Sequence, residues 1–125
     1  MATITPTITD ISMRGDGSVQ QVIWASVTQA DTCLAVKFPQ YADKTIQVAG
    51  TFGGASVAVN GSIDGTNFAP LTDQGGTVIA ITTAPAASIK QVLQNALYVQ
   101  PAATGGAGQS LTISMIFRLS NPLRT

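Results

Sequence analysis

Acidic side chains are the groups in this sequence best suited to chemistry. The chain has six of them, all aspartate, and it has no histidine. General acid–base catalysis most often uses histidine, glutamate or aspartate, and glycoside hydrolysis needs two carboxyl groups with different pKa values. Nearly all of these aspartates instead stand in predicted turns, where an aspartate accepts hydrogen bonds from nearby backbone N–H groups. The six residues, which we expect to shape loops in a protein that is not an enzyme, are Asp10, Asp16, Asp31, Asp43, Asp64 and Asp73.

A bound metal or another cofactor would also lack ligands. Cys33 is the single cysteine, so the chain cannot form an internal disulfide or a cysteine–histidine zinc site. A nucleophilic thiol needs a neighbouring base, and the apolar run 33–36 predicts a buried Cys33 instead. The segment 64–67, Asp-Gly-Thr-Asn, offers oxygen atoms for calcium, but its Asp-Gly pair is typical of a tight turn. We therefore expect no cofactor.

Three further motifs match functional patterns but are better explained as loops. Residues 50–54 are rich in glycine, yet they contain no lysine and no helix is expected after them, so they do not form a phosphate-binding loop. Residues 14–16 read Arg-Gly-Asp, an integrin-binding tripeptide whose glycine also suits an ordinary loop. Residues 60–62 read Asn-Gly-Ser, a glycosylation motif that is used only in secreted proteins. None of the three predicts a function.

The low charge of the chain restricts its partners. Only 10% of the 125 residues are charged, against about 25% in average proteins, and the formal net charge is zero. Without a basic patch, binding to nucleic acid lacks its main source of free energy. No apolar run approaches the length that spans a membrane, and no secretion leader is visible, so we expect synthesis in the cytoplasm. A neutral surface rich in hydroxyl and amide groups loses its water easily, which favours protein partners and homo-oligomers.

The pattern of apolar residues predicts an all-β fold. Short alternating runs are separated by turns rich in Gly, Asp and Asn, as in a single antiparallel β-sandwich of the jelly-roll or immunoglobulin kind. Residues 85–95 fit either one helical turn or an irregular segment. The expected strands are 19–28, 34–38, 44–50, 55–63, 77–83, 96–100 and 111–119.

Three of these strands carry more detailed expectations. Strand 111–119 places Leu111, Ile113, Met115, Phe117 and Leu119 on one face, which predicts that this face is core. Strand 19–28 is apolar on both faces, which predicts that it is covered on both sides. Strands 44–50 and 55–63 flank a Gly-Gly turn and are expected to form a hairpin, with Ile63 on the same face as Val57 and Val59.

An extended arm precedes the sandwich. Residues 3–9 alternate Thr and Ile around a proline, which suits an arm or an edge strand because proline cannot donate to a central ladder. We therefore divide the chain into an N-terminal arm and loop, residues 1–18, and a sandwich domain, residues 19–125. The arm is the candidate partner-binding segment, since it can add a strand to a neighbouring subunit. Its residues are Thr3, Ile4, Thr5, Pro6, Thr7, Ile8 and Thr9.

The central and C-terminal parts of the chain resemble a family of known proteins. Residues 47–57 read Gln-Val-Ala-Gly-Thr-Phe-Gly-Gly-Ala-Ser-Val, and 60–68 read Asn-Gly-Ser-Ile-Asp-Gly-Thr-Asn-Phe. Together with 71–73 and 89–101 they resemble small virion proteins of tailed bacteriophages, which carry the pattern GTFGGA-V-GS-DGTNW-L-D. Phe68 stands where the pattern usually has tryptophan, a reduction in volume that a core position can accept.

The resemblance and the neutral surface lead to the same expectation for function. They predict a decoration, or cement, protein that binds the major capsid protein on the outer surface of the virion. Such a protein would be a homo-oligomer, with a trimer favoured by analogy, and would need no small-molecule substrate, nucleic acid or membrane. Two alternatives remain: another virion part such as a tail, baseplate or head–tail joining protein, or a carbohydrate-binding module. The last predicts an exposed aromatic platform, whereas Trp24 and Phe117 lie in apolar runs typical of a core.

Overall fold

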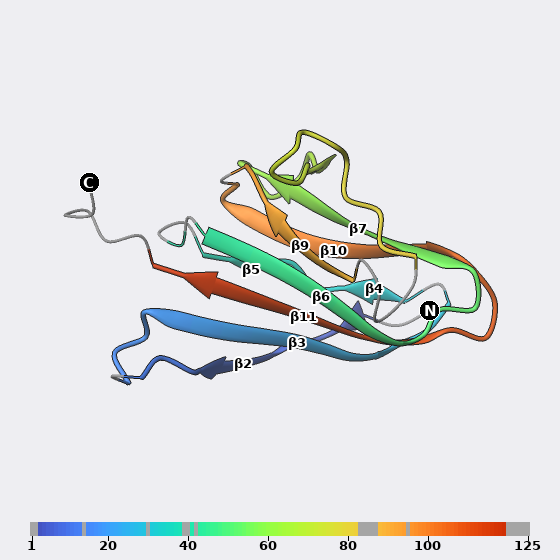
Figure 1. The fold of residues 1–125 in the computed structure, drawn as a ribbon, viewed down its shortest axis with the longest axis horizontal. Coiled ribbons are helices and arrows are strands. Elements are labelled where there is room, and N and C mark those ends of the chain that lie inside the picture. The colour runs from blue at the N-terminus through green and yellow to red at the C-terminus, as the bar shows by residue number, and fades with distance from the viewer. Residues whose placement is uncertain are drawn as a thin grey trace.

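The computed structural model describes residues 3–13, 15–29, 31–38, 41, 43–82, 88–94 and 96–119. These residues form strands and loops without a helix, and no helix within them is long and apolar enough to cross a membrane (Figure 1). The strands are β1 Thr3–Ile4, β2 Thr7–Asp10, β3 Val19–Val27, β4 Thr32–Cys33, β5 Val36–Lys37, β6 Asp43–Thr51, β7 Ala55–Ser62, β8 Ala69–Pro70, β9 Ile89–Val92, β10 Tyr98–Gly105 and β11 Ser110–Arg118.

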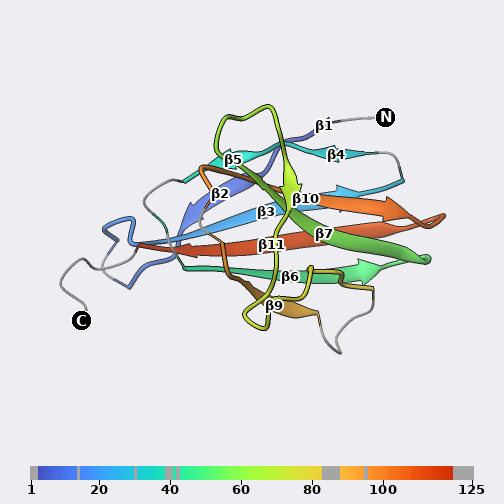
Figure 2. The same cartoon turned by 90° about the horizontal axis from the view of Figure 1, so that it is seen from above.

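Two antiparallel sheets form the β-sandwich that the sequence predicts. One has five strands in the order β2-β3-β11-β6-β9, and the other has four in the order β5-β10-β7-β8 (Figure 2). The short strands β1 and β4 pair in parallel beside them. Alternate residues of the long strands point between the sheets, so a strand that is half apolar buries one whole face.

The core lies between the sheets and is centred on β11. Leu111, Ile113, Met115 and Phe117 are fully buried, as the alternation predicts. Trp24 of β3 is also fully buried, and its indole N–H donates a hydrogen bond to the backbone oxygen of Leu34 at 3.0 Å. Such a bond is needed because a buried indole N–H without an acceptor would be costly.

The predicted hairpin of 44–50 with 55–63 is wrong, because β6 and β7 belong to different sheets. The turn after β6 carries the chain across the sandwich, and the turn between β10 and β11 crosses back beside it. The backbone N–H of Ala107 donates to the oxygen of Gly53 at 3.0 Å, which holds the two crossings together. Gly53 has a positive φ of 58°, and a Cβ at this position would strike the Ala107 oxygen. Glycine suits this crossing as well as it suits a hairpin, so composition could not separate the two.

The prediction that β3 is covered on both sides is also wrong. Val22 and Trp24 face the core, whereas Ile23 is half-buried and Ala25 is exposed on the outer side. The pairing register with β11 shifts between Leu111 and Ile113, beside Ser26, which has a φ of 57°. This irregularity turns the next residue, Val27, back into the core. The apolar pattern on the second face thus marks a surface that is uncovered in the single chain.

Several strand boundaries differ from the prediction because pairing, and not composition, limits a strand. The segment expected at 77–83 makes only isolated bridges, at Val78 and Ile81, although Ile79 and Ile81 are buried; residue 83 lies outside the described residues. Of the ambiguous segment 85–95, residues 88–94 are described, and they contain β9 in place of a helical turn.

Of the predicted strand 34–38, only Val36 and Lys37 form a strand, β5. The predicted strand 96–100 corresponds to the longer strand β10. Two residues at strand ends, which were predicted to face the core, are instead exposed. Leu119 is 44% exposed and Ile63 is 80% exposed, because each lies beyond the last paired residue of its strand.

Candidate interaction surfaces

Asp64 acts as a turn former and does not share its carboxylate with another acidic group. Its carboxylate accepts the backbone N–H groups of Thr66 and Asn67 at 2.8 Å each and the Ser62 hydroxyl at 2.7 Å. These donors hold the pKa of Asp64 well below its usual range, with the backbone bonds as the largest cause. The carboxylate oxygen atoms that Asp64 would offer to calcium are thus engaged by the loop itself.

Asp10 and Asp16 hold the loop that joins the arm to the sandwich. The Asp10 carboxylate accepts the backbone N–H of Ser12 at 2.9 Å and that of Gly17 at 3.0 Å, while Asp16 accepts the N–H of Ser18 at 3.1 Å. The pKa of each carboxyl is lowered, chiefly by its hydrogen bonds to Ser12 and Ser18 respectively. The loop is thereby closed on itself, and β2 and β3 form a short hairpin.

The remaining aspartates and Cys33 also have structural surroundings. Asp31 accepts the backbone N–H and hydroxyl of Thr28, and Asp73 accepts backbone N–H groups of its own turn. Asp43 alone lies in a long strand, β6. Cys33 is 2% exposed, and burial raises the pKa of its thiol to about 11, with the nearby Asp31 adding to the effect. A thiol with this pKa is protonated at neutral pH and is a poor nucleophile.

The structure holds the candidate arm against its own domain. β1 pairs in parallel with β4, through Thr3 with Thr32 and Ile4 with Cys33. β2 then pairs antiparallel with the edge of β3 from Thr7 to Asp10. Addition of this arm to a neighbouring subunit stays a prediction, and it would require these pairings to open.

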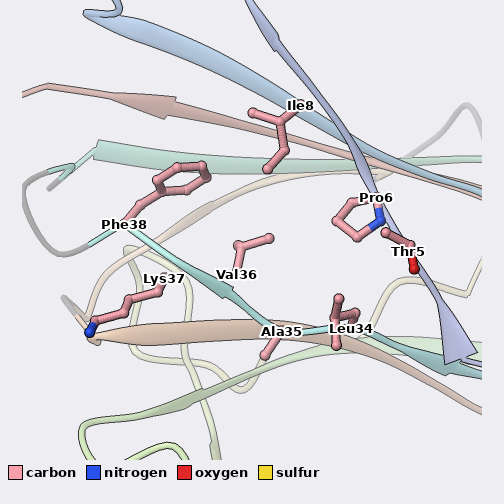
Figure 3. Close-up of a pocket in the computed structure, with 8 residues that line it drawn as sticks. All are labelled: Thr5, Pro6, Ile8, Leu34, Ala35, Val36, Lys37 and Phe38. Atoms are coloured by element: carbon pink, nitrogen blue, oxygen red, sulfur yellow. The ribbon is translucent and has the colours of Figure 1, made fainter.

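The arm instead helps to build an apolar groove. After Ile4 the arm turns towards β3, while the chain after Leu34 continues into β5, so the two segments separate as a fork. The fork encloses a groove of about 270 Å³ (Figure 3). Ile8 on one wall and Val36 and Phe38 on the other point towards one another. Its lining residues are Thr5, Pro6, Ile8, Leu34, Ala35, Val36, Lys37 and Phe38.

One side chain of the groove wall is anchored to the core, and others are exposed. The Phe38 ring packs against the Phe117 ring in a tilted contact with centroids 4.9 Å apart, and it makes an edge contact with Tyr41 at 5.2 Å. In contrast, Ile8 is 51% exposed and Leu34 is 46% exposed. Both walls are sheet edges, because β2 ends the five-stranded sheet and β5 ends the four-stranded sheet.

A second surface is the outer side of the five-stranded sheet, which we call the neutral face. Its side chains are hydroxyls, amides and isoleucines, and a hollow of about 210 Å³ crosses it beside Ile116. The charged residues Asp43 and Arg118, which are register partners, stand at one end of it. The residues of the neutral face are Thr7, Thr9, Gln21, Ile23, Thr45, Gln47, Ile89, Gln91, Thr112, Ser114 and Ile116.

Sequence reasoning found one wall of the groove and missed the other. Thr5, Pro6 and Ile8 belong to the predicted arm, whereas residues 34–38 were predicted only as a short strand, with no role in binding. The proline at 39 and the shortness of that run were the only signs of an edge. The neutral face was visible in part, as the polar side of strand 111–119, but its full extent depends on which strands lie beside β11.

Comparison with known proteins supports the fold alone. No protein-family model and no curated protein sequence matches the chain. Among solved structures, the SPBc2 prophage-derived protein YomS is similar with a TM-score of 0.57 and 8% identity, over 79% of this chain and 93% of that chain. An experimental structure of a prophage-derived protein therefore shares this β fold.

Two further structures are similar at a lower level. The periplasmic g-type lysozyme inhibitor PliG of Aeromonas hydrophila has a TM-score of 0.49 and 15% identity, over 93% of this chain and 95% of that chain. The K1 cleaved adhesin domain of Lys-gingipain from Porphyromonas gingivalis has a TM-score of 0.42 and 13% identity, over 93% and 91%. These TM-scores are too low to establish a shared fold.

Proposed function

We propose that this protein is a non-enzymatic structural component of a bacteriophage particle, which binds the major capsid protein on the outer capsid surface and stabilises contacts between capsid subunits. It is made in the bacterial cytoplasm and acts as a homo-oligomer, with a trimer favoured. The motif resemblance of residues 47–73 and 89–101 and the fold shared with a prophage-derived protein both support a phage origin.

The neutral face is the observation that carries this proposal. It offers a broad sheet surface whose hydroxyl, amide and isoleucine side chains are cheap to desolvate compared with charged groups. Interfaces that bury a central patch are depleted of charge in that patch and keep charge at the rim. The position of Asp43 and Arg118 at one end of the neutral face agrees with this arrangement. Turn hydrogen bonds engage the carboxylates of Asp10, Asp16, Asp31, Asp64 and Asp73, which supports a structural role for them.

The aromatic residues give no support to the carbohydrate-binding alternative. A sugar platform needs aromatic rings with their faces open to solvent. Trp24, Tyr41 and Phe117 are buried, and the other four aromatic side chains are half-buried. Placement in the tail, baseplate or head–tail joint remains a variant of the same structural role and is distinguished by symmetry.

The test is to localise the protein on the particle. Particles are produced from the genome that encodes this chain, with and without its coding sequence, and both are reconstructed by electron cryo-microscopy. The proposal expects density on the outer capsid at three-fold or quasi-three-fold positions, absent from the deletion particles and restored by adding purified protein. Density confined to the tail or portal axis would contradict capsid decoration, and identical reconstructions would contradict any role in the virion.

Two matched variants connect the particle result to the neutral face. Ile116→Lys places a charge in the centre of this face, whereas Val78→Lys makes a similar change at an apolar side chain that is 52% exposed elsewhere. We expect Ile116→Lys to fail to restore density and Val78→Lys to restore it fully. Equal restoration by both would show that the neutral face is not the contact surface.

The arm can be tested on the same particles. Deletion of residues 1–9 should leave the sandwich folded, since Ile4 packs only partly buried against the core and the other described arm residues lie outside the core cluster. We expect the shortened protein to lose capsid binding if the arm reaches a partner. Full occupancy by the shortened protein would show that the arm makes no essential contact.

A further inference from the structure

One strand edge of the molecule is covered along only half of its length. The segments β4 and β5 are nearly continuous and both lie beside β10: Val36 and Lys37 pair with it directly, and Gln100 of β10 donates its side-chain N–H to the backbone oxygen of Cys33 at 2.7 Å. β1 covers the far side of β4, and the Leu34 N–H donates to the oxygen of Ile4 at 3.0 Å. β5 has no such neighbour among the described residues, because it ends its sheet.

The apolar groove lies beside this uncovered half. The arm leaves the edge at Thr5, and from there Pro6 and Ile8 form the opposite wall (Figure 3). An open strand edge supplies backbone donors and acceptors, while the walls supply an apolar surface for alternate side chains. Ile8 and Leu34, about half exposed each, are well placed to become buried. At β4, the same edge already pairs with a short extended strand, β1.

We propose that this groove binds an extended segment of another protein, which adds to the edge of β5 as a new strand and places apolar side chains between Ile8 and Val36. The segment carries a carboxylate at the end that meets Lys37, which is the charged residue among the described residues that line the groove. The Lys37 side chain points away from Ile8, on the opposite side of β5 from Val36, and its ammonium lies 5.7 Å from the Tyr98 ring centroid. A carboxylate on the added strand would meet it on that side. This strand site is separate from the neutral face.

Charge favours a different protein over a second copy of this chain. The C-terminal residues 121–125 contain Arg124 and no acidic side chain, so they would oppose Lys37. The arm strand β2 ends in Asp10, but the carboxylate of Asp10 already accepts hydrogen bonds from the backbone N–H groups of Ser12 and Gly17, which hold the arm on its own domain. An acidic, strand-forming segment is the complementary occupant.

The test uses the full chain and synthetic peptides. Uniformly ¹⁵N-labelled protein is titrated with the blocked peptide Thr-Val-Thr-Ile-Thr-Val-Asp and with the same peptide ending in Lys. Amide shifts are expected at residues 5–8 and 34–38, with the Asp peptide binding about two- to fivefold more tightly, as for an exposed ion pair. Lys37→Glu should reverse that preference. A peptide methylated on alternate backbone nitrogens should bind at least about tenfold more weakly, because it cannot complete the strand ladder.

Matched variants keep the result independent of folding defects. Ile8→Asp should abolish binding, whereas Ile63→Asp, at another exposed isoleucine outside the groove, should leave binding unchanged. The proposal is overturned if the shifts centre on the neutral face, if the methylated peptide binds equally well, or if no shifts appear at about 1 mM peptide. Shifts of groove residues that depend on protein concentration alone would assign the groove to a second copy. The particle reconstruction above is unaffected by any of these outcomes.

Discussion

The inner and outer sides of the five-stranded sheet are built from the same strands and have opposite roles. On β11, Phe117 and Met115 point inwards and are fully buried, while their neighbours Ile116 and Ser114 point outwards onto the neutral face. The aromatic side chains of the sheet, Trp24 and Phe117, both lie on the inner side. The outer side keeps enough apolar surface for association and almost no charge. Successive residues of a strand therefore alternate between side chains that stabilise the fold and side chains that belong to the proposed contact surface.

The largest expected effect is at Phe117. We expect Phe117→Ala to lower the free energy of unfolding by about 3–5 kcal/mol, because it removes a buried ring and leaves a cavity. Chemical denaturation measured by tryptophan fluorescence checks this. Ile116→Ala, the next residue on the opposite side, should lower it by no more than about 1 kcal/mol. Similar losses at both positions would remove the contrast between the two sides.

A smaller effect is expected where the chain crosses between the sheets. Gly53→Ala should lower the free energy of unfolding by about 1–3 kcal/mol. Alanine rarely adopts the positive φ found at this position, and its methyl group would strike the Ala107 oxygen. Gly76→Ala has a similar φ of 84° but open space around it, so it should cost less. Thermal unfolding of the two variants, compared with the parent protein, separates the contact from the backbone preference. Equal shifts would show that the crossing contact contributes nothing.

Acid should weaken the loops before it affects the inner side of the sheet. The pKa values of Asp10, Asp16 and Asp64 are lowered in the folded state, so their contribution is present above the unfolded pKa near 3.8. It is lost as the pH falls below that value and through the folded pKa values. Stability measured between pH 6 and 2 should therefore decline below about pH 4. Asp64→Asn should decline less steeply, and an unchanged slope would contradict the role assigned to its loop.

The smallest effect on stability is expected on the neutral face. Gln47 is exposed in the middle of β6, and Gln47→Ala should change the free energy of unfolding by less than about 0.5 kcal/mol. If the neutral face is a contact surface, the same variant should still weaken binding to particles, measured by co-sedimentation. A large loss of stability would show that the outer side also supports the fold.

Local patterns predicted most of the elements, one wall of the groove and part of the neutral face. The alternation from Leu111 to Phe117 and the turns predicted at Asp64 and Asp73 were confirmed, because side-chain period and turn chemistry depend on neighbouring residues. Lys44 shows a limit of that reasoning. It shares the parity of Ile46 and Val48 and is 2% exposed on the inner side, where burial lowers its pKa and Asp43 partly opposes the effect. Its position was visible in the sequence, but its burial contradicts the usual preference of lysine.

The sequence by itself determined the β class, the turn positions, the burial of Trp24 and Cys33, and the scarcity of charge. Only the tertiary structure decided that the Gly-Gly turn joins different sheets, that the outer side of β3 stays uncovered, and that β5 is an edge. The physical reason is that side-chain alternation is a local property, whereas strand neighbours are chosen by hydrogen bonds between residues far apart in the chain. The groove beside β5 exists because two edges separate at Thr5, a feature that neither segment contains alone.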